Sequence, residues 1–187
     1  EYTSLVRAAY CEIKKVDPEA KVIYGGTCMC PYFAEKVFEN KGYHYFDILG
    51  VHYYDKPPNI YTTVNRITYC HAQHLWKKFK SAKPILNTEG STCYYPNPDK
   101  TGKSLNAAED PEFKKPGDLI KLYVFHASRG IEKFCWFNPW GIFTATMDRK
   151  LRPMPPLVSY AVMTSILEDS KYRGRLSLES PDIFVYA

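Results

Sequence analysis

The regular alternation of helix-type and strand-type segments is the feature that most restricts how this 187-residue chain can fold. Apolar residues at helical spacing predict helices over residues 2–16, 31–40, 60–80, 118–129 and 157–167. Short apolar runs predict strands over residues 21–26, 46–54, 84–89 and 133–138. Strands that alternate with helices form a parallel sheet with the helices packed outside it. The sequence therefore predicts an α/β fold with four strand–helix units.

Two architectures use such units, an open doubly wound sheet and half of an eight-stranded barrel. A nucleotide-binding open sheet carries a glycine-rich phosphate loop after a strand, and Gly25-Gly26 is too short for that fingerprint. The tail differs from the rest of the chain, because residues 173–178 and 183–186 alternate like two antiparallel strands. We expect a main domain over residues 1–170 and the beginning of a small β-rich appendage over residues 171–187.

One carboxylate stands at the end of the third predicted strand. The apolar run that begins at Pro84 leads into Asn87-Thr88-Glu89, and we expect the chain to turn sharply at Gly90 and leave Glu89 on display. The carboxyl ends of parallel barrel strands are where that fold carries its chemistry. Taken alone, Glu89 fits a surface glutamate in a turn. The polar and aromatic ends of the other strands favour a functional site.

Composition and charge narrow the possible partners. Tyr, Phe and Trp make up 16% of the chain, a surplus that fills a core or stacks on flat ligands such as sugar rings. The net charge of +5 is modest, and the densest basic run, residues 77–80, lies near the end of a predicted helix, where a solvated surface is favoured over a nucleic-acid patch. No apolar run is long enough to span a membrane. The six cysteines lack the spacing of a metal site, and His71 falls on the apolar face of its helix.

The strand ends 51–54 (Val-His-Tyr-Tyr), 88–90 (Thr-Glu-Gly) and 136–138 (Trp-Phe-Asn), in that order, resemble the last half of a clan A glycoside hydrolase. Members of that clan are (β/α)8 TIM barrels and retaining glycosidases. The likeness covers most of the chain and implies that its four strands are barrel strands five to eight. The tail resembles the β-domain beside the barrel in xylosidase-like members. The resemblance implies hydrolysis of β-glycosidic bonds in oligo- or polysaccharides, no cofactor, and a secreted, periplasmic or lysosomal protein.

The same resemblance assigns roles to individual residues. Glu89 matches the catalytic nucleophile, and His52 or Tyr54 matches the residue that orients it. Trp136 matches the aromatic floor of the sugar subsite. The remaining substrate-binding candidates lie on the same expected face: Asn138, Trp140, Tyr94 and Tyr95.

The sequence departs from the clan at the acid/base glutamate. That residue belongs in an Asn-Glu-Pro-type motif at the end of strand four, and no such motif occurs here. Glu1 opens a helix and does not take the role. We therefore expect the rest of the barrel, in the same or another chain, to supply the acid. Two alternatives stay open: a carbohydrate-binding half-barrel without turnover, and a structural α/β protein that dimerises to close a barrel.

Overall fold

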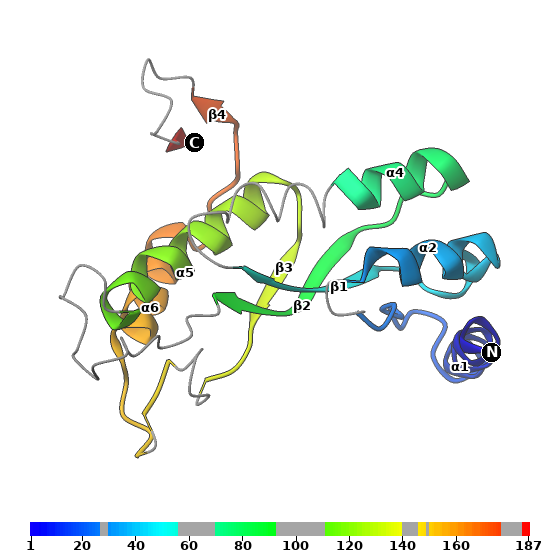
Figure 1. Ribbon diagram of the computed structural model, residues 1–187, viewed down its shortest axis with the longest axis horizontal. Coiled ribbons are helices and arrows are strands. Elements are labelled where there is room, and N and C mark those ends of the chain that lie inside the picture. Colours follow the sequence, from blue (N-terminus) through cyan, green and yellow to red (C-terminus); the bar gives the residue numbers. More distant parts are fainter. Residues whose placement is uncertain (27–29, 56–69, 93–110, 140–145, 149, 177–184) are drawn as a thin grey trace, which may run out of the picture. The chain divides into compact units, whose positions relative to one another are not determined.

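The computed structural model describes residues 1–26, 30–55, 70–92, 111–139, 146–148, 150–176 and 185–187. Its elements are shown in Figure 1. The helices are α1 (Tyr2–Val16), α2 (Pro31–Glu39), the 3-10 helix η1 (Gly42–Tyr45), α4 (Cys70–Phe79), α5 (Pro111–Ser128) and α6 (Pro155–Leu167). The strands are β1 (Leu49–Asp55), β2 (Ile85–Thr92), β3 (Lys133–Trp136), β4 (Arg175–Leu176) and β5 (Val185–Tyr186).

The central sheet has the strand order β1-β2-β3 (Figure 1), and a parallel bridge between Ile23 and Ile48 extends it beside β1. Helices connect its successive strands, as parallel pairing requires. This confirms the predicted α/β fold with a parallel sheet. The predicted strand over residues 21–26 is reduced to that single bridge, because two glycines follow Tyr24 and glycine weakens a strand.

The strands begin next to one another. The Ile48 N–H donates to the Val22 carbonyl (3.2 Å), and the Leu49 N–H donates to the Pro84 carbonyl (2.9 Å). The Glu132 N–H in turn donates to the Ile85 carbonyl (3.2 Å). Because parallel strands that start together also end at the same edge, the residues that follow these points share the carboxyl edge of the sheet.

The chain divides into two compact units. The first comprises Glu1–Tyr53, Tyr61–Gly90 and Ile131–Cys135, and the second comprises Tyr54–Ile60, Ser91–Gly130 and Trp136–Ala187.

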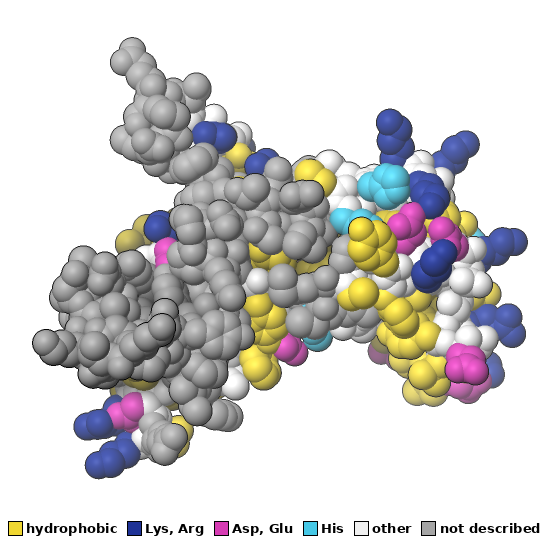
Figure 2. All heavy atoms as spheres, viewed as in Figure 1, with side chains coloured by type: hydrophobic (Ala, Val, Ile, Leu, Met, Phe, Trp, Pro, Cys, Tyr) yellow, Lys and Arg dark blue, Asp and Glu magenta, His cyan; other side chains and the backbone are white. Residues whose placement is uncertain are grey.

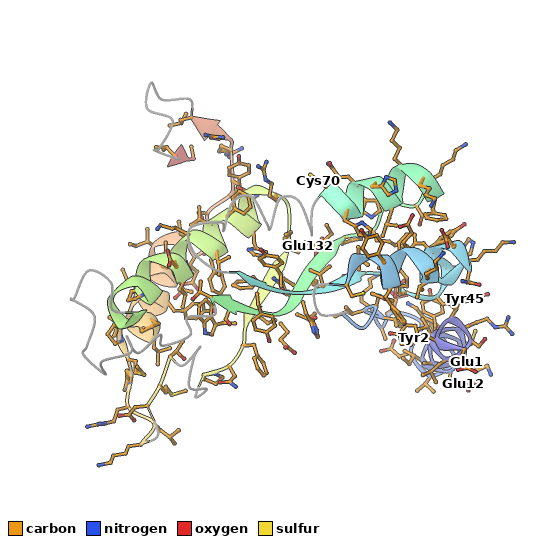
Figure 3. All side chains as sticks on the ribbon, viewed as in Figure 1. Glu1, Tyr2, Glu12, Tyr45, Cys70 and Glu132 are labelled. Atoms are coloured by element: carbon orange, nitrogen blue, oxygen red, sulfur yellow. The ribbon has the colours of Figure 1, made fainter. Side chains whose placement is uncertain are left out.

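The core of the first unit is built from aromatic and aliphatic side chains of the sheet, α2 and α4. The ring of Phe38 is at its centre, with ring centroids 5.7 Å from Phe46 and 5.5 Å from Phe79. Leu75 and Ile85 are buried in the same cluster. The helix α1, which carries the labelled Tyr2 in Figure 3, packs on the rest of this unit through its aromatic residues. The ring centroids of Tyr10 and Tyr45 are 6.3 Å apart.

The second unit is organised around α5 and α6, which pack on each other. The buried positions Leu119, Leu122 and Phe125 recur along α5 at a spacing of three residues, as one face of a helix requires. The rings of Tyr123 on α5 and Tyr160 on α6 lie 5.2 Å apart. In the tail, β4 and β5 pair antiparallel with Arg175 opposite Tyr186, which confirms the expected strand pair.

Two expectations about the segment after Glu89 are wrong. The chain does not turn at Gly90, because β2 continues to Thr92. A β-carbon on Gly90 would meet the Tyr53 carbonyl oxygen and the Phe134 ring, so glycine serves a close approach between strands. The helix expected over 118–129 begins earlier, at Pro111, and contains Pro116.

The described residues contain no helix that is long and apolar enough to cross a membrane. Among the same residues, no group of three or more histidine, cysteine, aspartate or glutamate side chains is arranged to hold a metal ion. The first half of the helix expected over 60–80 lies outside the described residues, and α4 accounts for its second half.

Candidate active site

Glu89 on β2 and His52 on β1 are brought together on neighbouring strands, each three residues before its strand ends at Thr92 or Asp55. The distance between Nδ1 of His52 and Oε2 of Glu89 is 3.7 Å, which is too long for a hydrogen bond and short enough for strong electrostatic contact when the imidazole is protonated. The side chains are 23% and 31% exposed, so both are reachable from solvent while their bases are held in the sheet.

The register of β1 and β2 explains why the side chains of His52 and Glu89 lie close together. Leu49 and Pro84 are joined by a backbone hydrogen bond, so β1 and β2 run side by side from their first residues. His52 lies three residues beyond Leu49, and Glu89 lies five residues beyond Pro84. Both positions therefore fall near the carboxyl edge, and neighbouring strands are only about 4.8 Å apart.

Asn87 holds the backbone on which Glu89 sits. Its side chain is fully buried, and its Oδ1 accepts a hydrogen bond from the Glu89 N–H at 3.3 Å. A side chain that bonds the backbone two residues ahead fixes the local conformation in the manner of an Asx turn. Asn87 is a site residue that was not predicted from the sequence. The available signal was the two-residue spacing from Glu89, which places both side chains on one face of a strand.

The other candidates belong to the second unit or lie outside the described residues. The ring of Tyr54 contacts Phe137 edge-on, with centroids 6.3 Å apart and an interplanar angle of 89°. Trp136 and Asn138 are both half-buried. The expected meeting of these three residues with Glu89 stays a prediction. Trp140, Tyr94 and Tyr95 lie outside the described residues.

Asp47 stabilises the other end of the sheet, where the strands begin. Its Oδ2 accepts from the Val22 N–H (2.8 Å) and pairs with the Lys14 ammonium of α1 (3.1 Å), while the Tyr10 hydroxyl reaches Oδ1 at 3.4 Å. Partial burial favours the protonated carboxyl, but the Val22 N–H and the Lys14 ammonium outweigh it and hold the pKa of Asp47 below its ordinary value. This cluster anchors α1 at the end of the strands away from Glu89.

Charges on the neighbouring helices are paired. Figure 2 shows basic and acidic side chains intermixed over α2 and α4. Lys78 on α4 pairs with Glu35 on α2 at 2.7 Å, and Lys36 pairs with Glu39 at 2.7 Å. The hydrogen bond from Lys78 lowers the pKa of Glu35, and the hydrogen bond from Lys36 lowers the pKa of Glu39. The described surfaces of α2 and α4 therefore carry neighbouring charges of both signs.

Comparison with known proteins finds similarity in the fold. No protein-family model matches the sequence, and no curated protein matches it. The chain is similar over 100% of its length to a family 39 glycoside hydrolase from Bacteroides cellulosilyticus WH2, with a TM-score of 0.68 and 16% identity. It is similar over 91% of its length to a glucosidase from Croceicoccus marinus, with a TM-score of 0.63 and 12% identity. A family 128 endo-β-1,3-glucanase variant from Amycolatopsis mediterranei matches over 86% with a TM-score of 0.51 and 13% identity.

The chain covers only part of these structures. It spans 41% of the Bacteroides chain, 37% of the Croceicoccus chain and 65% of the Amycolatopsis chain. At identities of 12–16%, the similarity shows that the chain shares its fold with part of these glycoside hydrolase structures.

Proposed function

We propose that this chain forms the C-terminal half, strands five to eight, of the barrel of a retaining glycoside hydrolase that cleaves β-glycosidic bonds. The observation that carries the proposal is the 3.7 Å approach of His52 Nδ1 to Glu89 Oε2 near the carboxyl edge of a parallel sheet. Barrel enzymes hold their chemistry at that edge. The similarity in fold to glycoside hydrolases supports a glycoside as the substrate.

Glu89 is the nucleophile in this mechanism. Its carboxylate oxygen attacks the anomeric carbon, while a second carboxyl group, about 5–5.5 Å away, protonates the departing glycosidic oxygen. The bond from the anomeric carbon to that oxygen breaks, and a glycosyl ester of Glu89 forms. The second group then takes a proton from water, the water oxygen attacks the anomeric carbon, and the Glu89 carboxylate is released. Two displacements retain the anomeric configuration.

His52 and Asn87 prepare Glu89 for the attack. The imidazole faces one carboxylate oxygen, and a movement of well under 1 Å would bring the pair into hydrogen-bond range, as often occurs when a substrate binds. Asn87 holds the Glu89 backbone by accepting a hydrogen bond from its N–H. A nucleophile fixed in this way loses little freedom on reaching the transition state.

The rest of the site follows from the same proposal. Tyr54 is the alternative to His52 as the residue that orients Glu89, Trp136 forms the floor of the sugar subsite, and Asn138 binds the substrate beside it. The acid/base carboxyl comes from the other half of the barrel, in the same or another chain, because this sequence contains no Asn-Glu-Pro motif. Two carboxyl groups are sufficient for this reaction, so the mechanism uses no cofactor.

The test compares Glu89→Gln with the unaltered sequence in the protein that contains both barrel halves. We expect turnover of aryl β-glycosides to fall by at least about 10³-fold, because removing a nucleophile disables the groups that act with it. Glu132→Gln is the matched control, because Glu132 is exposed at the start of β3 (Figure 3) and its replacement should leave turnover unchanged. A 2-deoxy-2-fluoro glycoside with a good leaving group should add one glycosyl mass to the peptide that carries Glu89.

The outcomes separate the three readings. Retention of configuration, observed by proton NMR of the first-formed sugar, together with a labelled Glu89 supports the proposal. Inversion, or a label on another residue, contradicts it. Sugar binding that survives Glu89→Gln with no turnover in either form would indicate a binding half-barrel. If the protein neither binds sugar nor turns it over, Glu89 has a structural role.

A further inference from the structure

A glycine lies against His52 on the side away from Glu89. Gly26 follows the segment that bridges to β1, where the Tyr24 N–H donates to the Ile48 carbonyl at 2.8 Å. A β-carbon built on Gly26 would lie 2.7 Å from His52 Nε2 and 3.0 Å from His52 Cγ, and closer still to His52 Cδ2. Carbon atoms do not approach a ring this closely, so any side chain at position 26 requires the imidazole or the backbone to move.

The imidazole is thus held at two opposite edges. Its Nε2–Cδ2 edge faces the backbone of Gly26, and Nδ1, across the ring, faces Oε2 of Glu89. The three residues come from three neighbouring segments of the same unit, at successive positions across the sheet. No other residue type would allow the first segment to come this close to the ring.

We infer that Gly26 is a positioning residue that sets the orientation of His52 and, through it, the orientation of the Glu89 carboxylate. The effect of Gly26 on turnover rests on the proposed function, whereas the contact between Gly26 and the His52 ring does not. A methyl group at position 26 would displace the ring, which would change the distance between Nδ1 and Oε2. Displacements of about 1 Å in a catalytic arrangement can reduce rates by about 10²-fold.

The first experiment measures the contact in the chain itself. Gly26→Ala is compared with Gly25→Ala, a matched control in which the nearest atom to the added methyl is the Tyr2 hydroxyl oxygen at 3.2 Å. The rate at which diethyl pyrocarbonate modifies His52 is followed by peptide mass spectrometry. We expect Gly26→Ala to change this rate at least threefold and Gly25→Ala to leave it within a factor of two. An unchanged rate in Gly26→Ala overturns the inference.

A second variant covers the case in which Gly26→Ala does not fold. The double variant Gly26→Ala/His52→Ala removes the ring that the new methyl would meet. If the overlap with His52 is the cause of the defect, the double variant regains the cooperative thermal transition of the unaltered chain. A double variant that stays unfolded while His52→Ala folds overturns the inference, because the defect at position 26 would then be independent of the ring.

The third experiment uses turnover in the protein with both barrel halves. We expect Gly26→Ala to lower kcat at least tenfold with KM within a factor of two, and to have no further effect in a His52→Ala background. A change in His52 reactivity without glycosidase activity in any form would support the contact and remove the proposed function. Activity that is equal in Gly26→Ala and the unaltered protein would overturn the positioning role while the proposed function stands.

Discussion

His126 shows how a buried side chain links stability to pH. The residue lies on α5 with 1% of its surface exposed, and its Nδ1 donates to the Leu122 carbonyl at 2.7 Å. Burial lowers the pKa of His126 from 6.5 to about 4, although the hydrogen bond to Leu122 acts in the opposite direction. The folded protein therefore keeps a neutral imidazole at pH values where the unfolded chain takes up a proton.

This difference predicts a loss of stability in mild acid. The contribution of His126 is complete above pH 6.5 and is lost as the pH falls from 6.5 towards 4. The displacement of the pKa corresponds to roughly 3 kcal/mol over that window. We expect the unfolding free energy from urea titrations to fall steeply between pH 6.5 and pH 4.5, and His126→Gln to flatten that slope. Parallel slopes in both proteins would contradict the prediction.

Sequence reasoning reached some of these residues and missed others. The proximity of Glu89 and His52 was predictable because polar side chains that follow apolar runs on two strands of a parallel sheet come to the same side of it. Asn87 was missed because its only signal was the two-residue spacing from Glu89, which does not by itself show a hydrogen bond to the Glu89 N–H. The role of Gly26 was invisible, because a glycine pair reads as a turn until the ring of His52 is placed beside it. Gly90 was misread for the same reason.

At the scale of elements, α1 depends on a polar anchor. The helix has no fully buried residue, and Leu5 and Val16 are 65% and 88% exposed. Its connection to the sheet combines aromatic contacts with the pairing of Lys14 and Asp47. Because Asp47 also accepts the Val22 N–H, one carboxylate joins the helix, the edge segment and the entrance to β1.

Removing that carboxylate should destabilise the first unit. We expect Asp47→Ala to lower the unfolding free energy by about 2 kcal/mol, because hydrogen bonds to charged groups contribute about 1.5–3 kcal/mol. The control is Glu12→Ala, which breaks the exposed pair with Lys15 on the same helix and should cost less than about 1 kcal/mol. Equal effects in chemical denaturation would show that Asp47 is an ordinary surface charge.

Elements with strong periodicity were the most predictable. The helices α1, α2 and α6 lie within two residues of their predicted bounds, because α1 and α2 carry a clear apolar face and α6 begins at a pair of prolines. The start of α5 was misplaced, because the helix begins at Pro111 and includes Pro116. The strand over 21–26 was overestimated, because pairing depends on partners that a local pattern does not contain.

At the scale of the whole molecule, the chain resembles part of a glycoside hydrolase in fold, and several of its described apolar side chains are exposed. On α6, Val158, Val162 and Ile166 recur every four residues and are 56%, 51% and 70% exposed. A soluble chain rarely exposes a continuous apolar stripe that has no partner. Such a surface favours association of the chain with itself when nothing else covers it.

This predicts concentration-dependent association of the isolated chain. We expect Val162→Lys/Ile166→Lys to weaken self-association at least about tenfold, because each apolar side chain buried at an interface contributes more than about 1 kcal/mol. Ala161→Lys/Ser165→Lys is the matched control, since it adds the same charge to exposed positions of the same helix. Sedimentation velocity over a concentration series measures both. An equal response in the two variants would point to charge repulsion and contradict the prediction.

The sheet separates two tasks along the length of its strands. Asp47 and Lys14 secure the ends where the strands begin, whereas His52 and Glu89 lie further along the strands, towards their carboxyl ends. A substitution at His52 or Glu89 therefore leaves the anchoring contacts in place. Side chains near the carboxyl ends of the strands can therefore vary in evolution while the contacts at the other ends keep the sheet and α1 together.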